Sequence, residues 1–504
     1  MKKFLALILA LVTVSSLLVA CATNTGNPDT TTLPSEDGSQ APENTEAQTK
    51  FEDLKDNTVA DFDGDIVKIL AWEDAEQLEF EFVSDDVQMT QVNEAIFNRN
   101  KAVEKRLNCS LMFNYNKGNY NNITNFLKRV EAIENGTEND YMDIYAAYSM
   151  TTATLSTNGF CANLMKLQSE TGLNFNKPWW PSSMVEEGMF GDKLYICTGD
   201  ISTNLLWMME TLYFNKELIV NYGYTKEELY DHVNNGTWTL DVFFNYVYDT
   251  YVDTDGDNKK SAGDTYGYTF GTWNGYTDDF YVGCGFKFFE RDASGTLAVA
   301  STLGGEKEHD LVTRLVDFTY EDDVHRVTSD ADVFLANRAI FTNNRASYAK
   351  KIRDNSEVEY GILPMPKYDT IQENYSTNIG FPHTLYAVAA GAPDRALAGT
   401  ALQSMAAQSY EIITPVLFEE TLQLRYSPEN VDAEMFDILK DRLCFDVGRM
   451  YCKSVNDYSW SLFRNSVNAQ STAYTTQVAM IMTKITASDG YLATLVDQLT
   501  KADN

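Results

Sequence analysis

The chain has 504 residues and a formal net charge of −34, which arises from 73 acidic and 39 basic side chains. Binding to nucleic-acid phosphates requires a basic surface, so this charge argues against a nucleic-acid partner. The length exceeds what one compact core supports, and 44% of the residues are hydrophobic, so we expect two domains with sizeable cores.

The first 21 residues have the pattern of a lipoprotein signal. Lys2 and Lys3 precede an apolar run, and the stretch "LVAC" ends at Cys21. A bacterial lipoprotein signal has this order of charge, apolar core, small residue and cysteine. We therefore expect residues 1–20 to be a removable signal peptide and Cys21 to carry a lipid that anchors the mature protein. The alternative is an ordinary secreted protein with an incidental cysteine.

Residues 21–56 are nearly devoid of large apolar side chains and rich in Thr, Ser, Asn, Pro and acidic residues. Such a segment cannot bury enough surface to offset the entropy of ordering, so we expect a disordered tether. No later stretch is long and apolar enough to span a membrane. The folded body is therefore expected outside the cytoplasm, on the extracellular face of the cell membrane.

Strand and helix patterns alternate in the next part of the chain. Buried-strand runs occur at 66–72, 109–116 and 141–149, and apolar residues have helical spacing at 92–108 and 120–136. Strands that alternate with helices form a parallel sheet covered by helices, which gives an α/β fold.

Two strand ends supply the first candidate site residues. Ligands of parallel sheets bind beyond the carboxyl ends of the strands. Trp72, Glu73 and Asp74 end the first predicted strand, and residues 148–151, which begin with Tyr148 and Ser149, end the third. We expect these side chains near a ligand.

The loop "VDTDGDNKKSAGD" has the spacing of a calcium-binding loop. Asp253, Asp255 and Asp257 occupy positions one, three and five, and Asp264 occupies position twelve. Asn258 stands where glycine usually allows the sharp turn, although Asn tolerates the left-handed conformation. The two interpretations are a weak structural calcium site and a solvated turn.

Apart from Cys21, the six cysteines form no C-x-x-C pair, and the four histidines show no metal-ligand spacing. We expect buried free thiols, with a bridge between Cys444 and Cys452 as the alternative. The sequence has no nucleophile elbow, phosphate-binding glycine loop or zinc-protease motif. So acidic a chain offers many carboxylate pairs, and nothing singles one out as a glycosidase pair. We expect no enzymatic activity and no cofactor apart from the calcium ion of the first interpretation above.

A series of motifs covers the chain from about Asp65 to Asn468. In order they are "DIYAAYSMTTATLSTNGFCANL", "KPWWPSSMVEEGMFGDKLYICTGD", "LYFNKEL", "TWTLDVFFNYV", "YGYTFGTWNGY", "VFLANRAIFTNN", "YGILPMPKYD" and "DYSWSLFRNSV". In their order and spacing they resemble the extracellular solute-binding proteins of ABC importers, in the carbohydrate-type family 1 that includes maltose-binding protein.

The resemblance implies a periplasmic-binding-protein-like fold of type II, with two α/β lobes, a hinge and a ligand cleft between the lobes. Carried over to this chain, lobe one comprises 57–208 plus 360–398, and lobe two comprises 209–359 plus 399–504. The crossings between lobes would lie near 207–213, 360–366 and 395–404.

The resemblance also implies which residues line the cleft. Sugars stack their C–H faces on aromatic rings, and their hydroxyls need polar partners. The aromatic candidates are Trp72, Tyr148, Trp207, Trp273, Tyr276 and Trp460. The polar candidates are Glu73, Asp74, Asn274, Asn343, Asn344 and Arg464. For each tryptophan, packing in the core is the alternative.

These features together predict a lipid-anchored, monomeric receptor that captures a sugar or oligosaccharide and delivers it to the permease subunits of an ABC importer. The first alternative is the same fold binding a peptide or another polar solute. The second is a lipid-tethered surface glycoside hydrolase or esterase, which a turnover assay would distinguish.

Overall fold

The computed structural model describes residues 60–74, 81–82, 90–270, 275–326, 332–417 and 430–501. All of them belong to one compact unit, Leu54–Asn504. The predicted signal peptide, Cys21 and the predicted tether lie outside the described residues. Within the described ranges, no helix has both the length and the hydrophobicity that a membrane crossing requires.

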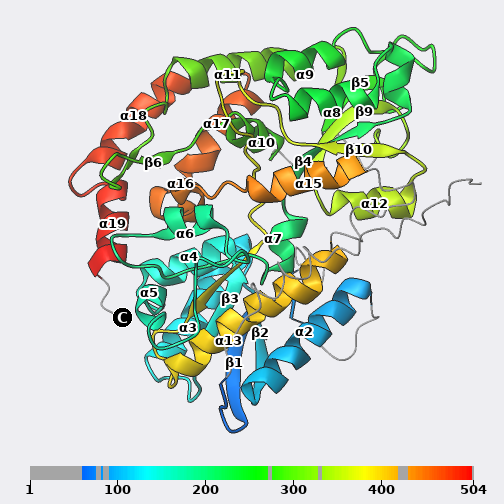
Figure 1. Ribbon diagram of the computed structural model, residues 1–504. Coiled ribbons are helices and arrows are strands. Elements are labelled where there is room, and N and C mark those ends of the chain that lie inside the picture. Colours follow the sequence, from blue (N-terminus) through cyan, green and yellow to red (C-terminus); the bar gives the residue numbers. More distant parts are fainter. Residues whose placement is uncertain are drawn as a thin grey trace, which may run out of the picture. The chain divides into compact units, whose positions relative to one another are not determined.

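Four strands form the first sheet, in the order β11-β3-β1-β2 (Figure 1). Their bounds are β1 Asp65–Trp72, β2 Cys109–Asn116, β3 Ile144–Tyr148 and β11 Thr384–Val388. β1 runs parallel to β2 and β3, whereas β11 runs antiparallel to β3. The predicted alternation of strands and helices, with parallel pairing, is confirmed.

The helices of this region begin and end where the sequence favours it. Their bounds are α2 Gln91–Leu107, η1 Tyr120–Asn122, α3 Ile123–Glu134, α4 Ser149–Thr157, α5 Leu164–Leu167, α6 Ser182–Gly188 and α7 Thr203–Trp207. In α2, the Thr90 side chain caps the N terminus, and Asn108 ends the helix in the left-handed conformation at φ 45°. Ile96 and Val103 on its apolar face are fully buried.

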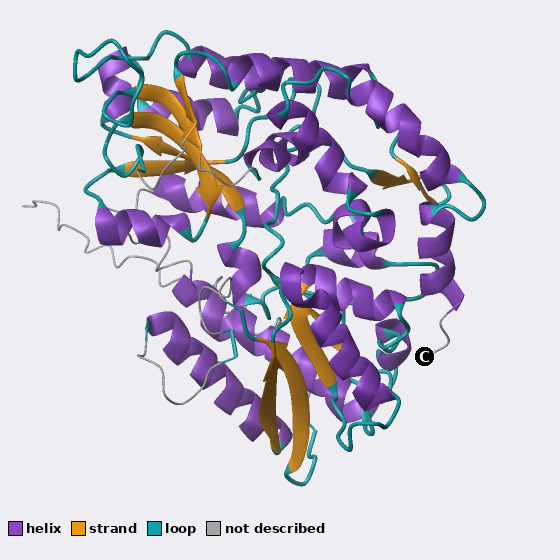
Figure 2. Cartoon of the chain, turned by 180° about the vertical axis from the view of Figure 1, so that it is seen from behind, coloured by secondary structure: helices purple, strands orange, loops and turns teal. Residues whose placement is uncertain are grey.

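Five strands form the second sheet, in the order β10-β4-β9-β5-β8, and Figure 2 shows the two sheets as separate groups of strands. Their bounds are β4 Glu210–Asn215, β5 Tyr266–Phe270, β8 Val324–Arg326, β9 Ala339–Arg345 and β10 Tyr360–Leu363. β4 pairs antiparallel with β9 and β10, and β5 pairs parallel with β8 and β9. A separate hairpin consists of β6 Phe289–Arg291 and β7 Leu297–Val299.

Helices and an aromatic core surround the second sheet. The helices between its strands are η2 Leu218–Tyr222, α8 Lys226–Asn234, α9 Leu240–Val247, α10 Tyr276–Gly283, α11 Glu306–Phe318 and α12 Tyr348–Asn355. Phe243 of α9 has ring contacts with Tyr268, Phe280, Phe318 and Phe341, which lie on two strands and two other helices. These contacts hold α9, α10 and α11 against the sheet.

The remaining helices come from the C-terminal part of the chain. They are α13 Arg395–Gln408, η3 Ser409–Ile413, α15 Asn430–Asp441, α16 Val447–Met450, η4 Cys452–Val455, α17 Tyr458–Asn468, α18 Tyr474–Thr486 and α19 Tyr491–Lys501. α15 contacts β10, whereas α19 contacts both α4 and β7. α13 contacts β1 and β11, so the C-terminal helices pack against strands of both sheets.

Two adjacent segments connect the sheets. One joins α7 to β4, and the other joins β10 to β11. They pair antiparallel at Met209 and Ile379. The Gly380 N–H donates to the Met208 carbonyl at 2.8 Å, and the Glu210 N–H donates to the Asn378 carbonyl at 2.9 Å.

The structure places two elements differently from the predicted lobe boundaries. β10 pairs with β4, so residues 360–363 belong to the second sheet rather than to a first lobe or a crossing. α13 contacts α2, β1 and β11, so the predicted boundary at 398 and the crossing at 395–404 fall within a helix of the first sheet. An apolar run predicts a strand or helix but does not identify its partner. The other lobe boundaries stay predictions.

Candidate functional site

A cavity of about 600 Å³ lies among the ends of β3 and β9, the start of β4, and the helices α10 and α17. We call it the aromatic cavity. Its lining residues are Tyr120, Tyr148, Met150, Glu210, Tyr276, Asp279, Asn343, Asn344, Arg345, Phe381, Pro382, Trp460 and Arg464. Tyr148 and Arg345 are the last residues of their strands, so the cavity lies at strand ends, as expected for a ligand site of an α/β fold.

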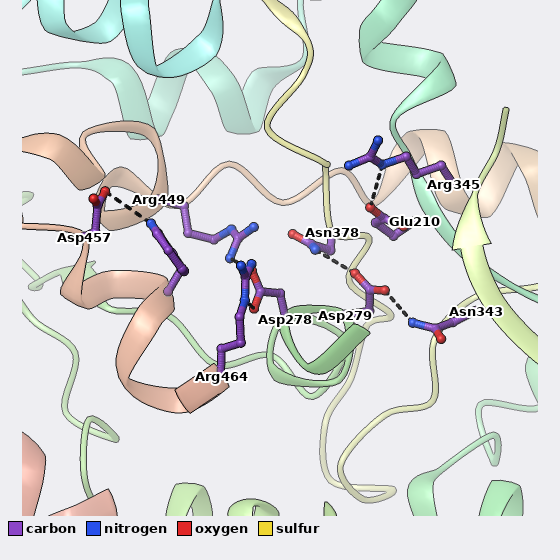
Figure 3. Close-up of polar contacts among 10 residues, drawn as sticks. Glu210, Asp278, Asp279, Asn343, Arg345, Asn378, Arg449, Asp457 and Arg464 are labelled. Carbon is purple, nitrogen blue, oxygen red and sulfur yellow. Dashed lines mark hydrogen bonds and ion pairs between the residues drawn. The ribbon is translucent and has the colours of Figure 1, made fainter. Parts of the chain in front are cut away.

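Arg464, which lines the cavity, belongs to a buried cluster of one carboxylate and two guanidinium groups (Figure 3). Asp278 of α10 accepts a hydrogen bond from Arg449 at 2.9 Å, and bonds from Nε and Nη2 of Arg464 at 3.0 and 2.5 Å. Burial opposes the ionisation of Asp278, but the two arginines outweigh it, and its pKa lies below the ordinary value. Asp278 is therefore the charged partner that permits the burial of both arginines.

The next residue on α10 is part of a second polar group. Asp279 accepts hydrogen bonds from the side-chain amides of Asn343 at 2.6 Å and Asn378 at 2.7 Å. The Tyr268 hydroxyl donates to Asn343 Oδ1 at 2.6 Å, which fixes the orientation of that amide. Burial raises the pKa of Asp279 well above its ordinary value, and the neighbouring Glu210 carboxylate adds to the shift.

A third polar pair lies at the ends of β4 and β9. Arg345 Nε donates to Glu210 Oε1 at 3.3 Å. Burial raises the pKa of Glu210, and Arg345 opposes that shift. A Cβ atom at Gly380 would lie 3.1 Å from Arg345 Nε and 3.2 Å from Glu210 Oε1. Glycine therefore lets the connecting segment lie directly against the pair.

Aromatic rings form the remaining surface of the cavity. The Arg464 guanidinium lies 4.4 Å from the centroid of the Trp460 ring, and Arg449 lies 4.6 Å from the Phe381 ring. Phe381 and Trp460 meet edge to face at 6.4 Å between centroids. The ring of Tyr276, the first residue of α10, stacks on Phe270 at 3.9 Å between centroids, and this contact fixes its orientation. The cavity thus combines flat apolar faces with buried charged and amide groups.

Five of the predicted ligand-binding residues line this cavity, namely Tyr148, Tyr276, Asn344, Trp460 and Arg464. The polar candidate Asn343 lines it as well. These residues come from β3, α10, β9 and α17, so the fold brings distant segments of the sequence together. Their contact with a ligand stays a prediction.

Three other predicted residues lie in the core instead. Trp72 is fully buried, and its indole N–H donates to Thr384 Oγ1 at 2.9 Å. Trp207 is buried in α7. Ser149 is buried, and its hydroxyl donates to the Phe381 carbonyl at 2.7 Å. Trp72 and Ser149 lie at strand ends that neighbouring elements cover, so a position at a strand end does not by itself expose a side chain.

Two acidic candidates near the first strand end also lie outside the cavity lining. Asp74 accepts hydrogen bonds from the backbone N–H groups of residues 118–119 at 2.6 and 2.8 Å, so its carboxylate orders a turn of the protein itself. Glu73 is exposed and is not among the lining residues. Trp273 and Asn274 lie outside the described residues.

The sequence alone did not identify several lining residues, which are Tyr120, Glu210, Asp279, Arg345, Phe381 and Pro382, whereas Met150 lies within the candidate range 148–151. Asp279 lies one helical turn after Tyr276, so the helical period could have placed both on one face. No local pattern, however, pairs Glu210 with Arg345, because they meet only through the antiparallel pairing of β4 with β9.

A larger cavity, of about 1040 Å³, has a different lining. Lys177, Lys440 and Arg442 line it together with Asp200 and Glu373, and it contains none of the predicted site residues. Lys440 is already paired with Asp200 at 3.0 Å. The aromatic cavity is smaller, but it lies at strand ends and holds stacked rings beside buried polar groups, so we regard it as the candidate site.

The acidic loop brings three of its four predicted calcium ligands together. The nearest carboxylate oxygens of Asp253, Asp255 and Asp257 lie within 4.8 Å of one another. Asp264 instead accepts hydrogen bonds from the backbone N–H groups of residues 254 and 261 at 3.0 and 2.8 Å. Asn258 has φ 58°, the left-handed conformation expected at this turn. Calcium binding here stays a prediction.

The six cysteines that the structure describes are free thiols, and five of them are buried. Burial raises the pKa of Cys161, Cys197, Cys284 and Cys452, so these thiols stay protonated. The prediction of buried free thiols is confirmed, and Cys444 and Cys452 are not joined by a disulfide bond.

Solved structures, but no family model and no curated protein, resemble this chain. Among solved structures, it is similar to the maltose/maltodextrin-binding domain MalE from Bdellovibrio bacteriovorus bound to maltotriose. That match has a TM-score of 0.51 and 14% identity, and covers 82% of this chain and 98% of the other.

Two further structures show the same similarity. A cyclo/maltodextrin-binding protein complexed with maltotetraose matches with a TM-score of 0.52 and 13% identity, over 87% of this chain and 99% of the other. An ABC substrate-binding protein from Listeria monocytogenes in complex with cycloalternan matches with a TM-score of 0.50 and 13% identity, over 84% and 99%. The chain has the two-sheet α/β fold of these binding proteins. The predicted fold class is confirmed.

Proposed function

We propose that the chain is a solute-binding receptor that takes an oligosaccharide into the aromatic cavity and delivers it to an ABC importer. The observation that carries the proposal is the wall of α17, where the Trp460 ring lies at the cavity with the Arg464 guanidinium 4.4 Å from its centroid. An indole ring offers a face to sugar C–H groups, and a guanidinium offers donors to hydroxyls.

The rest of the cavity supports a polyhydroxylated ligand. Three tyrosines, Tyr120, Tyr148 and Tyr276, line the cavity beside the amides of Asn343 and Asn344. This set offers both donors and acceptors next to flat rings, which matches the alternating hydroxyls and C–H faces of a saccharide. The structural neighbours, at 13–14% identity, were solved with maltotriose, maltotetraose and cycloalternan.

The proposed receptor carries out no covalent chemistry. Ligand binding stabilises the form in which the two walls close on the solute, because only that form makes contacts with the ligand from both sides. The permease and ATPase would be separate chains. The proposed location is the extracellular face of the cell membrane, with Cys21 as the lipid-bearing residue.

Calorimetric titration of the full chain tests the ligand class. The panel contains maltotriose, maltotetraose, cycloalternan, short peptides and polyols. We expect saturable binding of at least one oligosaccharide and no binding of peptides. A ligand present at a hundredfold excess over its Kd should also stabilise the folded state by about 2.7 kcal/mol. Binding of a peptide but of no glycan would overturn the carbohydrate assignment and favour the alternative solute.

A Cys21→Ala variant tests the anchor. The exchange removes the only thiol that the signal pattern offers for lipid attachment. Cells that express the wild type should hold the protein in the membrane fraction, whereas the variant should be released. An equal membrane content of both proteins would contradict the lipid anchor.

A further inference from the structure

A contact between the two sides of the aromatic cavity lies at its edge. Tyr120 belongs to η1, which precedes α3 of the first-sheet region, whereas Asp457 directly precedes α17. The Tyr120 hydroxyl donates to Asp457 Oδ2 at 3.4 Å. Tyr120 and Trp460 both line the cavity, so this contact joins the wall that Tyr120 forms to the wall that α17 forms.

The Asp457 carboxylate has two further partners on its own side. Lys453 Nζ donates to Oδ2 at 2.8 Å, and the Trp460 indole N–H donates to Oδ1 at 3.3 Å. Lys453 also lies 3.9 Å from the centroid of the Tyr120 ring. One carboxylate therefore contacts Trp460, Lys453 and Tyr120.

The backbone around Asp457 takes an unusual course. Asn456 has φ 55° and Asp457 has φ 59°, so two consecutive residues other than glycine adopt the left-handed conformation. Asp457 precedes α17, yet its side chain makes no capping hydrogen bond to that helix. The carboxylate is thereby directed to Lys453, Tyr120 and Trp460 rather than to the helix N terminus.

The loop that carries Tyr120 is held from its own side as well. Asp74 accepts hydrogen bonds from the N–H groups of residues 118–119, and the Thr151 hydroxyl donates to the Gly118 carbonyl at 2.5 Å. Asp74 lies two residues after the end of β1, and Thr151 lies three residues after the end of β3. Tyr120 is thus fixed to the first sheet, and its hydroxyl reaches Asp457.

We propose that Asp457 is a positioning residue, which orients Trp460 and joins the two walls of the aromatic cavity through Tyr120. The inference rests on the proposed function in taking this cavity as the ligand site. Because the bonds to Tyr120 and Trp460 go to different oxygens of one carboxylate, movement of either wall changes the position of the other. The contact holds Trp460 in place before a ligand arrives.

Hydrogen–deuterium exchange of the full chain without any added ligand tests the coupling. The variants are Tyr120→Phe, which removes only the hydroxyl, and Asp457→Asn, because Asn tolerates the left-handed conformation. We expect Tyr120→Phe to speed exchange at residues 456–461 by about threefold or more, and Asp457→Asn to do the same at residues 118–122. A merely local role would change exchange only beside the substituted residue, and that result would overturn the proposal.

Tyr141→Phe is the matched control, since Tyr141 is also an exposed tyrosine of the first-sheet region and does not line the cavity. It should leave exchange at both segments unchanged. Faster exchange at residues 456–461 in this control would also overturn the proposal, because the effect would then follow from any tyrosine change.

Titration with maltotriose, maltotetraose and cycloalternan separates this inference from the proposed function. If the wild type binds one of them, Tyr120→Phe and Asp457→Asn should each weaken binding by about tenfold. The affinity of the double variant should be no lower than that of the single variant with the lower affinity. Additive losses would overturn the inference while leaving the proposed function intact. If the wild type binds none of them, the carbohydrate proposal fails, and the exchange experiment alone decides on the contact between the walls.

Discussion

The Arg464 guanidinium lies 4.4 Å from the centroid of the Trp460 ring, one helical turn away on α17, while its Nε and Nη2 atoms donate to Asp278. The guanidinium is therefore held from two directions, by an aromatic face and by a buried carboxylate. Such a group loses little conformational freedom when a ligand binds beside it. In the proposed receptor, the pair serves as a preorganised platform for the ligand.

Trp460→Ala should weaken ligand binding far more than it weakens the fold. Trp460 lines the cavity and is only partly buried, so its truncation removes a ligand contact without opening the core. We expect a loss of about 1–3 kcal/mol in binding free energy. Calorimetric titration and thermal unfolding of the same variant provide both values.

Trp238→Ala is the control for that experiment. Trp238 is fully buried and has ring contacts with Phe243 and Phe341 of the second-sheet core. Its truncation should cost about 3–5 kcal/mol of stability. If Trp460→Ala behaves like this control and keeps its affinity in the surviving folded fraction, Trp460 is a core residue and the platform does not exist.

Asp278→Asn should destabilise the fold strongly. The substitution keeps the shape of the side chain but leaves Arg449 and Arg464 without the carboxylate that compensates their buried charge. Removal of one partner of a buried ion pair typically costs about 3–5 kcal/mol. Urea unfolding of the variant and the wild type measures the difference.

An exposed ion pair offers the comparison. Asp241 pairs with Arg314 but is 80% exposed, so Asp241→Asn should cost less than about 1 kcal/mol. Equal stability losses at Asp278 and Asp241 would show that the buried cluster contributes nothing beyond an ordinary surface pair.

The sequence predicted the elements of the first sheet well, because their signals are local. The buried run before Trp72 and the helical spacing of Ile96 and Val103 depend only on neighbouring residues, and the strand and helix formed as expected. The spacing of Trp460 and Arg464 likewise placed both on one face of α17. Local periodicity is sufficient where one element supplies both residues.

The sequence could not predict features that depend on pairing between distant segments. β10 was expected beside the first lobe, but it joins β4 through antiparallel pairing that no local pattern encodes. Glu210 and Arg345 meet for the same reason. Trp72 depends on distant segments in the same way. A residue at a strand end is exposed or buried according to which side chains cover it, and the indole N–H of Trp72 donates to Thr384 of β11.

Calcium should bind the acidic loop only weakly, if the loop is the predicted structural site. Asp253, Asp255 and Asp257 have oxygens close together, but Asp264 bonds to the backbone of the loop and is shorter than the usual bidentate glutamate. Calcium should therefore raise the Tm of metal-free protein only at about 0.1–1 mM or above. The Asp255→Asn variant should lose that rise, and micromolar affinity in the wild type would contradict the prediction.

Glu308 should make the stability of the protein depend on pH. Its carboxyl group is fully buried and accepts hydrogen bonds from the hydroxyls of Tyr281 and Tyr474 at 2.9 and 2.8 Å, and from the Gly304 N–H at 2.7 Å. Burial raises its pKa to about 7, although these hydrogen bonds oppose the shift. The group thus holds α10, α11 and α18 together in its protonated form.

The sign of the dependence follows from the two states. In the unfolded chain this carboxyl group ionises near pH 4.5, whereas in the folded chain it keeps its proton up to about pH 7. Between these values the folded state binds more protons, so the free energy of unfolding falls as the pH rises and the loss is complete above pH 7. A shift of this size corresponds to about 3 kcal/mol. Glu81, whose pKa burial also raises to about 7, contributes in the same direction.

Glu308→Gln isolates the contribution of this residue, because glutamine has no proton to lose. Urea unfolding at pH 5, 6 and 7 should show a shallower decline for the variant than for the wild type, by up to about 1.4 kcal/mol per pH unit. The variant replaces one of the two acceptor oxygens with an amide group, which lowers its stability equally at each pH and therefore does not change the slope. Glu306→Gln, at an exposed position on the first turn of α11, should keep the slope of the wild type. If the unfolding free energies of Glu308→Gln and the wild type change in parallel with pH, Glu308 has the same pKa in the folded and unfolded states, and the prediction is wrong.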